Sequence, residues 1–344
     1  MNKVAIFSDL HLGLKQDAVE WHNVALEWCD WFVNELKKNN INDIIFLGDF
    51  FHVRTNISVN TLYVASLFLD KLKDFRVHMI FGNHDLYYQN EATVSGVNLF
   101  KNKNNIIVYD KPTIVKFGNK SALFSGWGYN PLEYSADVLF THAEIGIFKF
   151  NAELGPCNSG FKASELLHNF DIVYSGHFHL RQHKEWDNGK KIIYPGNPFS
   201  MDHSDFYGTI KGFDIFDFDT YDVVTIENTV SPKFCRMNLS EMCGGYYSIP
   251  ELQENIKNNV FKLIVDKNIT HKDLNILASL INSCRPFEFS YEWQDQIENK
   301  KDTKISFAEV FDLLGAINEF INLMDIDKKE VVRDYMINLY NRSK

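Results

Sequence analysis

Residues Ile44–His52 read IIFLGDFFH, a short apolar run that ends in Gly-Asp and is followed closely by a histidine. Its length and the glycine at its end predict a buried β-strand. Two similar runs, Val4–Phe7 and Val77–Phe81, also end beside polar residues, while Trp21–Lys38 and Val59–Lys73 have apolar residues at helical spacing. Strands that alternate with helices predict βαβ units and a layered α/β fold.

From Ile106 onward the apolar runs are short and strand-like, which predicts a second sheet or an extension of the first. The composition changes near Ser231-Pro232, where we expect a domain boundary. Beyond it, a strand at Val260–Val265, a helix starting at Thr270 and alternating aromatic residues over 287–293 predict a small β-α-β layer.

The last 50 residues differ again in character. Residues 295–304, DQIENKKDTK, have the composition of a charged linker. Two capping-box patterns, Ser306 with Glu309 and Asp327 with Glu330, predict a helical hairpin over 305–344. Its two apolar stripes could pack on their own domain or dock on a partner helix. They consist of Phe307, Val310, Leu314, Ile317 and Ile321, and of Val331, Tyr335 and Leu339.

Composition limits the class of protein. The chain has 344 residues, of which 45% are hydrophobic and 23% charged, as expected for a soluble protein with one large core and a smaller domain. It has no uninterrupted apolar run near the roughly 18 residues of a membrane span. Because a predicted strand begins almost at Met1, we expect no signal peptide, and the five scattered cysteines lead us to expect reduced thiols in a cytoplasmic protein.

Polar residues gather where the predicted strands end. Loops at the carboxyl ends of α/β strands converge on one crevice, so these residues should lie close together. Six of the twelve histidines are among them. Each alone is commonly a structural residue, but five strand ends with the same kind of side chain predict a binding site. The set is Asp9, His11, Asp49, His52, Asn83, His84, Asp85, His142, His177 and His179.

The donor types narrow the chemistry. Carboxylate, amide and imidazole groups without thiolate suit manganese, iron, zinc or magnesium. The set is too large for one ion, and a shared carboxylate would place two ions roughly 3.5–4 Å apart, as in two-metal phosphoryl-transfer sites.

In this order, DLHLG, GDFFH, GNHD, THAEI and GHFH resemble the five motifs of the calcineurin-like metallophosphoesterases. Protein serine/threonine phosphatases of that superfamily would carry GDxVDRG and GNHE, where this chain has GDFFHVR and GNHD. His52, the YPGNPFS stretch at Tyr194–Ser200, the small β-α-β layer and the terminal hairpin instead resemble the SbcD branch of DNA-repair nuclease subunits. The chain length and residues 321–343 are most similar to the bacteriophage recombination nucleases of that branch.

The resemblance implies a four-layer α/β/β/α sandwich with a small β-α-β capping domain and a C-terminal helical hairpin. The implied divisions are a nuclease domain over 1–235, a DNA-contacting capping domain over 236–294, a linker over 295–304 and a docking hairpin over 305–344.

The same resemblance implies the ligand sets. Asp9, His11, Asp49 and His179 would hold one metal ion, and Asp49, Asn83, His142 and His177 the other, so that Asp49 bridges. A hydroxide between the ions would attack phosphorus, since the cations lower the pKa of water. His84, oriented by Asp85, would stabilise the phosphoryl group and leaving oxygen, and His52 would contact the scissile phosphate.

The implied activity is a manganese-dependent 3′ to 5′ exonuclease on duplex DNA ends that also cuts single strands or hairpins, with magnesium, iron or zinc as alternative ions. The implied partners are an SbcC-type SMC-like ATPase and a second copy of the chain. A chain with a net charge of −10 can act on DNA only if the ions or the ATPase supply the positive charge that DNA binding needs. Lys15, Arg54 and Arg181 lie near the motifs, and we expect them to be exposed residues rather than phosphate contacts.

Two other interpretations stay open. The first is a metallophosphoesterase that acts on a nucleotide, a cyclic phosphodiester or a protein phosphate. It needs the same site but has no use for the hairpin. The second is a binding protein on a degenerate fold, which would be expected to have lost some of the seven ligands.

Overall fold

The computed structural model describes residues 2–88, 91–152, 154–206, 210–244, 246–265 and 269–294, together with residues 330 and 333. The chain divides into two compact units, Met1–Tyr291 and Glu292–Lys344. The predicted linker over 295–304 and nearly all of the predicted hairpin over 305–344, including its eight stripe residues, lie outside the described residues and stay predictions.

The first sheet carries the βαβ units that the sequence predicts. Its strand order is β14-β13-β1-β2-β3-β6. Neighbours from β1 to β6 are parallel, and β13 and β14 add an antiparallel edge. The strands are β1 (Lys3–Phe7), β2 (Asp43–Phe46), β3 (Arg76–Met79), β6 (Ile106–Val108), β13 (Gly212–Asp217) and β14 (Val223–Glu227). The connections contain α1 (Leu14–Asp17), α2 (Val19–Lys38) and α3 (Val59–Lys71).

The strands from Ile106 onward do both of the things that the sequence left open, because β6, β13 and β14 extend the first sheet while β7 to β12 form a second one. Its order is β11-β12-β10-β9-β8-β7, with a parallel centre and antiparallel strands at both edges. The strands are β7 (Thr113–Phe117), β8 (Lys120–Ser125), β9 (Val138–His142), β10 (Ile172–Gly176), β11 (Gln182–Glu185) and β12 (Lys191–Tyr194). Helix α4 (Ala163–Asn169) lies in the connection from β9 to β10.

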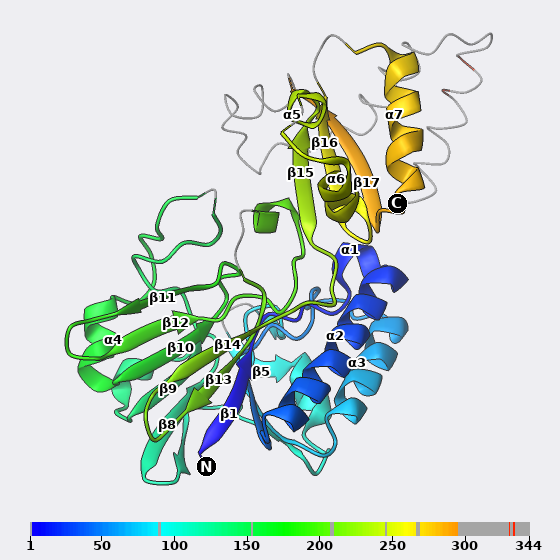
Figure 1. Ribbon diagram of the computed structural model, residues 1–344. Helices are drawn as coiled ribbons and strands as arrows, with labels where there is room; N and C mark the ends of the chain where they lie inside the picture. Colours follow the sequence, from blue (N-terminus) through cyan, green and yellow to red (C-terminus); the bar gives the residue numbers. More distant parts are fainter. Residues whose placement is uncertain are drawn as a thin grey trace. The chain divides into compact units, whose positions relative to one another are not determined.

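Three apolar clusters hold the layers together. Successive strand residues face opposite sides of a sheet, so Ala5 and Phe7 of β1 pack toward α2 and α3, while Val4 and Ile6 pack against the second sheet. A third cluster joins the outer face of the second sheet to α4. Figure 1 shows α2 and α3 on one side of the paired sheets and α4 on the other. The predicted α/β/β/α arrangement is confirmed.

Shorter elements complete the two-sheet core. The hairpin of β4 (Leu86–Tyr88) and β5 (Glu91–Ser95) follows the GNHD motif directly. The described part of the chain also contains the 3₁₀ helices η1 (Gly96–Phe100), η2 (Pro131–Glu133) and η3 (His203–Phe206).

The predicted small layer is present with more elements than the sequence suggested. Its sheet has the order β15-β16-β17, formed by β15 (Phe234–Asn238), β16 (Val260–Val265) and β17 (Glu288–Trp293). Its helices are α5 (Leu239–Cys243), α6 (Ile249–Ile256) and α7 (His271–Ser283), and Thr270 caps α7 as predicted. The sequence analysis did not predict β15, α5 or α6, although Ser248 and Glu251 form a capping box that marks the start of α6.

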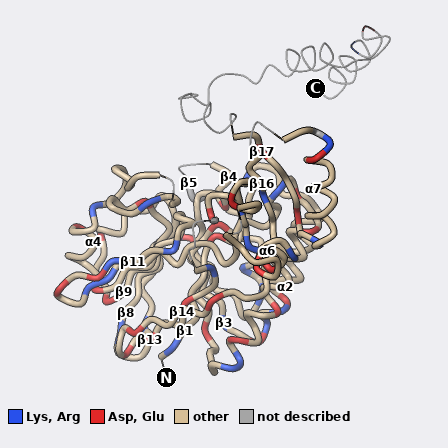
Figure 2. The backbone as a smooth tube through the Cα atoms, turned by 45° about the horizontal axis from the view of Figure 1, so that its top comes forward, with Lys and Arg blue, Asp and Glu red and all other residues tan. Residues whose placement is uncertain are grey.

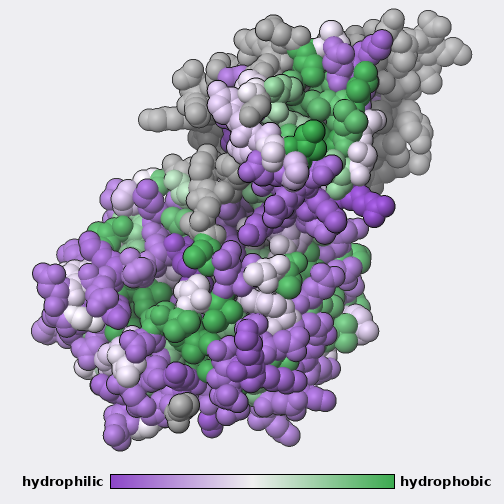
Figure 3. Space-filling model, in the orientation of Figure 1, coloured by the Kyte–Doolittle hydropathy of each residue, from purple (hydrophilic) through white to green (hydrophobic). Residues whose placement is uncertain are grey.

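The surface is polar and its charges are mixed. Figure 2 shows Lys and Arg interspersed with Asp and Glu along the described chain rather than gathered on one basic face. Figure 3 shows a mostly hydrophilic face with hydrophobic side chains on both the small domain and the main body of the molecule. On the small domain, Ile249, Ile276 and Leu280 are more than half exposed. Within the described ranges, no helix has the length and apolar character to cross a membrane.

Trp28 tests the packing of the first core. Its side chain is fully buried, and its ring stacks on Phe32 at 4.8 Å and on Phe68 at 6.2 Å between centroids. We expect Trp28→Ala to lower the free energy of unfolding by about 3–5 kcal/mol in urea titrations. Tyr63→Ala, at a side chain that is 63% exposed, should change it by less than about 0.5 kcal/mol. Equal effects of the two substitutions would contradict the described core.

Candidate metal centre

The two sheets bring five loops to one place. The loop after β1 runs beside the loop after β2, because the Asp9 N–H donates to the Gly48 carbonyl at 3.0 Å and the His11 N–H to the Asp49 carbonyl at 3.1 Å. In the second sheet, His142 ends β9 and is paired with Gly176 at the end of β10. The His177 N–H then donates to the Asp9 carboxylate at 3.1 Å, which joins the two sheets at the site.

Four of the predicted ligands have left-handed backbone conformations. The φ angles are 55° at Asp9, 50° at His11, 59° at Asp49 and 89° at His177. Such conformations are uncommon outside glycine and cost on the order of 1–3 kcal/mol each. They persist only where surrounding contacts hold them, and they are common at functional sites.

Asp85 provides much of that support. Its buried carboxylate accepts hydrogen bonds from the backbone N–H groups of Asp49 at 2.8 Å, Phe50 at 2.9 Å, Phe51 at 3.2 Å and Gly82 at 2.9 Å. Burial, with the nearby Asp49 charge, raises the pKa of Asp85 to about 7. The Asp85 side chain therefore shapes the loop that carries Asp49.

This corrects the expected role of Asp85 in orienting His84. The His84 imidazole instead has its Nδ1 at 2.7 Å from the His52 carbonyl oxygen, and the His84 backbone N–H donates to Asp49 Oδ1 at 2.8 Å. Asp85 is next to His84 in the sequence, but three of the four backbone N–H groups that donate to its carboxylate belong to Asp49, Phe50 and Phe51, 34 to 36 positions earlier.

One cluster contains the residues expected at the first ion. Ligand atoms of Asp9, His11 and His179 lie within 4.8 Å of one another. The Nε2 atoms of His11 and His179 are 3.1 Å apart, and Asp49 Oδ2 lies 3.7 Å from His11 Nε2.

A second cluster contains the residues expected at the other ion. Asp49, His142 and His177 also offer ligand atoms within 4.8 Å of one another. Asn83 Oδ1 lies 3.2 Å from His142 Nε2 and 3.0 Å from His177 Nδ1. Asp49 Oδ2 is 3.3 Å from His142 Nε2, so the same oxygen faces both clusters.

The protonation of these groups favours a cation between them. His142 Nδ1 lies 2.8 Å from the Leu47 carbonyl and must donate to it, which leaves Nε2 of the neutral ring as an acceptor facing the Asp49 and Asn83 oxygens. Acceptors that face one another need a proton or a metal ion between them. Burial alone would lower the pKa of His142, but the Asp49 carboxylate outweighs it and raises that pKa to about 9.

Other groups are already in the form that binds metal. Burial lowers the pKa of His11 well below its ordinary value and that of His177 to about 3, so both rings are neutral at pH 7. Burial opposes ionisation of Asp49, but the adjacent His142 and His11 together keep its pKa below the usual range. Neutral imidazoles and an ionised carboxylate are the species that coordinate divalent metals, so the residues fit such ions.

Glycine allows the loops to approach this closely. A Cβ atom on Gly82 would lie 2.2 Å from Asp49 Oδ1 and 2.6 Å from His142 Cε1. Gly176 is equally constrained, with Ser8 Oγ at 2.3 Å from the position of its Cβ. Any side chain at either position would displace a predicted ligand or its support.

A cavity of about 600 Å³ opens beside the two clusters. The predicted residues His52, Asn83, His84 and His177 line it. Val53, Arg54, Thr55, Trp127 and Glu144 also line it. The sequence analysis missed Trp127 and Glu144, although Glu144 lies inside THAEI and Trp127 follows a strand end. Arg54 lies in the cavity wall rather than simply on the outer surface.

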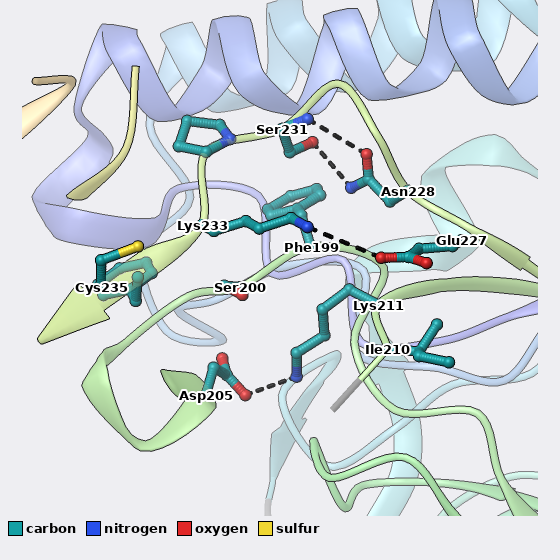
Figure 4. A pocket seen from close by; sticks show the side chains of 12 residues that line it. Phe199, Ser200, Asp205, Ile210, Lys211, Glu227, Asn228, Ser231, Lys233 and Cys235 are labelled. Carbon is teal, nitrogen blue, oxygen red and sulfur yellow. Dashed lines mark hydrogen bonds and ion pairs between the residues drawn. The ribbon is translucent and has the colours of Figure 1, made fainter. Parts of the chain in front are cut away.

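Buried polar residues also hold the backbone of His179 in place. In the pocket of Figure 4, the buried Lys211 ammonium pairs with Asp205. It also donates to the His179 carbonyl at 3.0 Å and to Asn197 Oδ1. The neighbouring Arg181 is paired with fully buried Asp214. Arg181 is therefore structural, which corrects its expected exposure.

Comparison with known proteins gives one family match and several similar chains. The model of the calcineurin-like phosphoesterase family matches residues 2–189. Exonuclease subunit 1 of Enterobacteria phage T4 is 28% identical over 356 residues, which cover 98% of both chains. A dimetal phosphatase from Danio rerio has a TM-score of 0.39 at 11% identity, with 62% of this chain and 91% of that chain covered. Nuclease MPE from Pseudomonas putida has a TM-score of 0.32 at 16% identity, with 62% and 83% covered.

Gly82 tests the packing of the two clusters. We expect Gly82→Ala to reduce the bound divalent metal, measured by mass spectrometry of purified protein, from about two ions per chain toward one or none. Gly155→Ala is the matched control, because nothing lies within 4 Å of a Cβ at that position. Full metal content in Gly82→Ala would show that the ions bind elsewhere.

Proposed function

This chain belongs to the calcineurin-like phosphoesterases, whose family model covers residues 2–189, and we propose that it is a metal-dependent DNA nuclease. The observation that carries the proposal is the Asp49 carboxylate, which lies between two clusters of ligand side chains beside an open cavity. The similarity to a phage exonuclease subunit extends along nearly the whole chain, including the small domain beyond the family match.

The ligand assignment follows the two clusters. Asp9, His11, Asp49 and His179 would hold one divalent ion, and Asp49 with Asn83, His142 and His177 the other. When bound, two such cations supply Lewis-acid stabilisation of the charge on the phosphoryl oxygens and make the attacking water more acidic. Manganese suits this mixture of oxygen and imidazole donors, with magnesium, iron and zinc as alternatives.

We propose that His84 acts on the phosphate rather than on a metal ion. Its Nδ1 is occupied by the His52 carbonyl, which leaves Nε2 as the ring nitrogen available to the cavity. A protonated Nε2 would donate to the phosphoryl or leaving oxygen, and the Nδ1 contact would keep the ring in position during that transfer. Its ring centroid lies 4.9 Å from that of His11, so the donor is close to the first cluster.

His52 would contribute as a neutral donor. Burial, followed by the positive charge that His84 can carry, lowers the pKa of His52. Its ring lies nearly parallel to that of His84, at 6.0 Å between centroids, and lines the same cavity. A neutral imidazole N–H there could bind a non-bridging oxygen of the scissile phosphate without competing with His84 for the proton.

Because the chain is acidic, we propose that other groups supply much of the positive charge that DNA binding needs. The net charge is −10, and Arg54 is the one arginine or lysine among the residues that line the described cavity. Bound cations would offset this charge locally, and a partner subunit would supply contacts along the duplex. We propose that this partner is an SbcC-type ATPase. We also propose that this chain forms a homodimer and that the complex works in the cytoplasm. The substrates would be duplex ends, cut 3′ to 5′, and single strands or hairpins.

His84→Ala separates phosphate chemistry from metal binding. With manganese, we expect the variant to lose DNA cleavage by about 10²–10⁴-fold while it keeps the metal content of the unmodified protein. His183→Ala, at an exposed position, should keep both. Parallel loss of metal and cleavage in His84→Ala would contradict its role. Cleavage of mononucleotide or protein phosphates, but not DNA, by the unmodified protein would refute the nuclease proposal.

Substitutions in the predicted hairpin over 305–344 test the proposed ATPase partner. We expect the double substitution Leu314→Asp and Ile317→Asp, on one predicted apolar stripe, to abolish co-purification with an SbcC-type ATPase, because two buried charges would oppose docking. Manganese-dependent cleavage of short single strands should remain. Ala308→Asp with Ala316→Asp, on the opposite side of the same predicted helix, is the matched double control. Unchanged co-purification of the double variant would place the contact elsewhere.

A further inference from the structure

A second cavity, of about 360 Å³, adjoins the one beside the metal centre. The two cavities share Trp127 and Glu144, and the second is also lined by Tyr129, Phe161 and the candidate ligand His142. Both volumes fall within the range of small-molecule sites. We propose that the second cavity binds the nucleobase of the nucleotide whose phosphate lies at the metal centre. This inference rests on the proposed nuclease function and names a subsite within it.

Trp127 is held where a base could stack on it. Its backbone N–H donates to the Phe81 carbonyl at 3.0 Å, which ties it to the residues that follow β3. Its ring centroid lies 4.9 Å from that of His177 and 6.0 Å from that of His142. The indole is therefore fixed directly beside the second ligand cluster. A nucleotide with its phosphate at that cluster would carry its base into the adjoining space.

The other walls are aromatic and supported. Tyr129 is half-buried, its hydroxyl donates to the Asp110 carbonyl at 2.8 Å, and its ring contacts Phe81 at 6.2 Å between centroids. Phe161 is half-buried on the third cluster of the core. Aromatic faces stack on any base, so a subsite of this kind binds nucleotides with little sequence preference.

The position of Glu144 indicates whether the second cavity would bind a base or a second phosphate. Its Oε1 lies 3.5 Å from His177 Nε2, and its Oε2 accepts a hydrogen bond from the Ser159 hydroxyl. A carboxylate in the wall repels a phosphate group but accepts hydrogen bonds from the N–H groups of a base. The second cavity therefore suits the base rather than the next phosphate along the strand.

Two chromogenic esters separate the subsite from the metal centre. Thymidine 5′-(p-nitrophenyl phosphate) carries a base, whereas methyl p-nitrophenyl phosphate does not. With manganese, we expect Trp127→Ala to lower kcat/KM for the thymidine ester by about 10- to 100-fold, the usual range for loss of one stacked base. Because the indole also packs on His142 and His177, the decisive quantity is the ratio of kcat/KM for the thymidine ester to that for the methyl ester. This ratio should fall by about tenfold or more in Trp127→Ala, and Trp127→Phe should restore most of it.

Binding measured without turnover gives an independent readout. Calorimetry should show that Trp127→Ala weakens binding of thymidine 5′-monophosphate by about tenfold or more relative to its effect on binding of inorganic phosphate. Equal losses for both members of either pair, or no loss for the thymidine compounds, would overturn the base subsite. If the unmodified protein cleaves the methyl ester without favouring the thymidine ester, the subsite fails and the phosphodiesterase stands. If it cleaves neither ester nor DNA, the proposed function itself fails and the subsite with it.

Discussion

The burial of the Asp49 carboxylate between two sets of imidazoles is the constraint on which the rest of the site depends. One of its oxygens faces His11 on one side and His142 on the other, while its second oxygen accepts the His84 backbone N–H. A buried carboxylate is costly unless it is paired, and here the pairing requires positive charge on both sides. The arrangement therefore favours cations over an empty polar core.

The fold supplies this arrangement at a cost in backbone strain. Parallel strands of two sheets end at one place, so ligands distant in sequence meet without long loops. Asp85 then uses four backbone N–H groups to hold the turn that presents Asp49. The apolar clusters on both faces of each sheet provide the rigidity that keeps left-handed residues such as Asp9 and His177 in place.

Much of this could be predicted from local pattern. Apolar runs that end in Gly-Asp or Gly-Asn-His predicted the strand ends. The side chains of the seven proposed ligands lie close together, and their binding of metal stays a prediction. The roles of Asp85, Trp127 and Lys211 could not be predicted, because each depends on groups far away in sequence: Asp85 on the turn after β2, Trp127 on His142 and His177, and Lys211 on the His179 carbonyl. Strand β15 was missed because its sequence, FCRMN, lacks a clear period and forms a strand only beside β16.

Anomalous diffraction from crystals grown with manganese tests the central claim most directly. The account predicts two peaks of anomalous density, one on each side of the Asp49 carboxylate and both within coordination distance of it. A single peak, or two peaks that share no Asp49 oxygen, would contradict it.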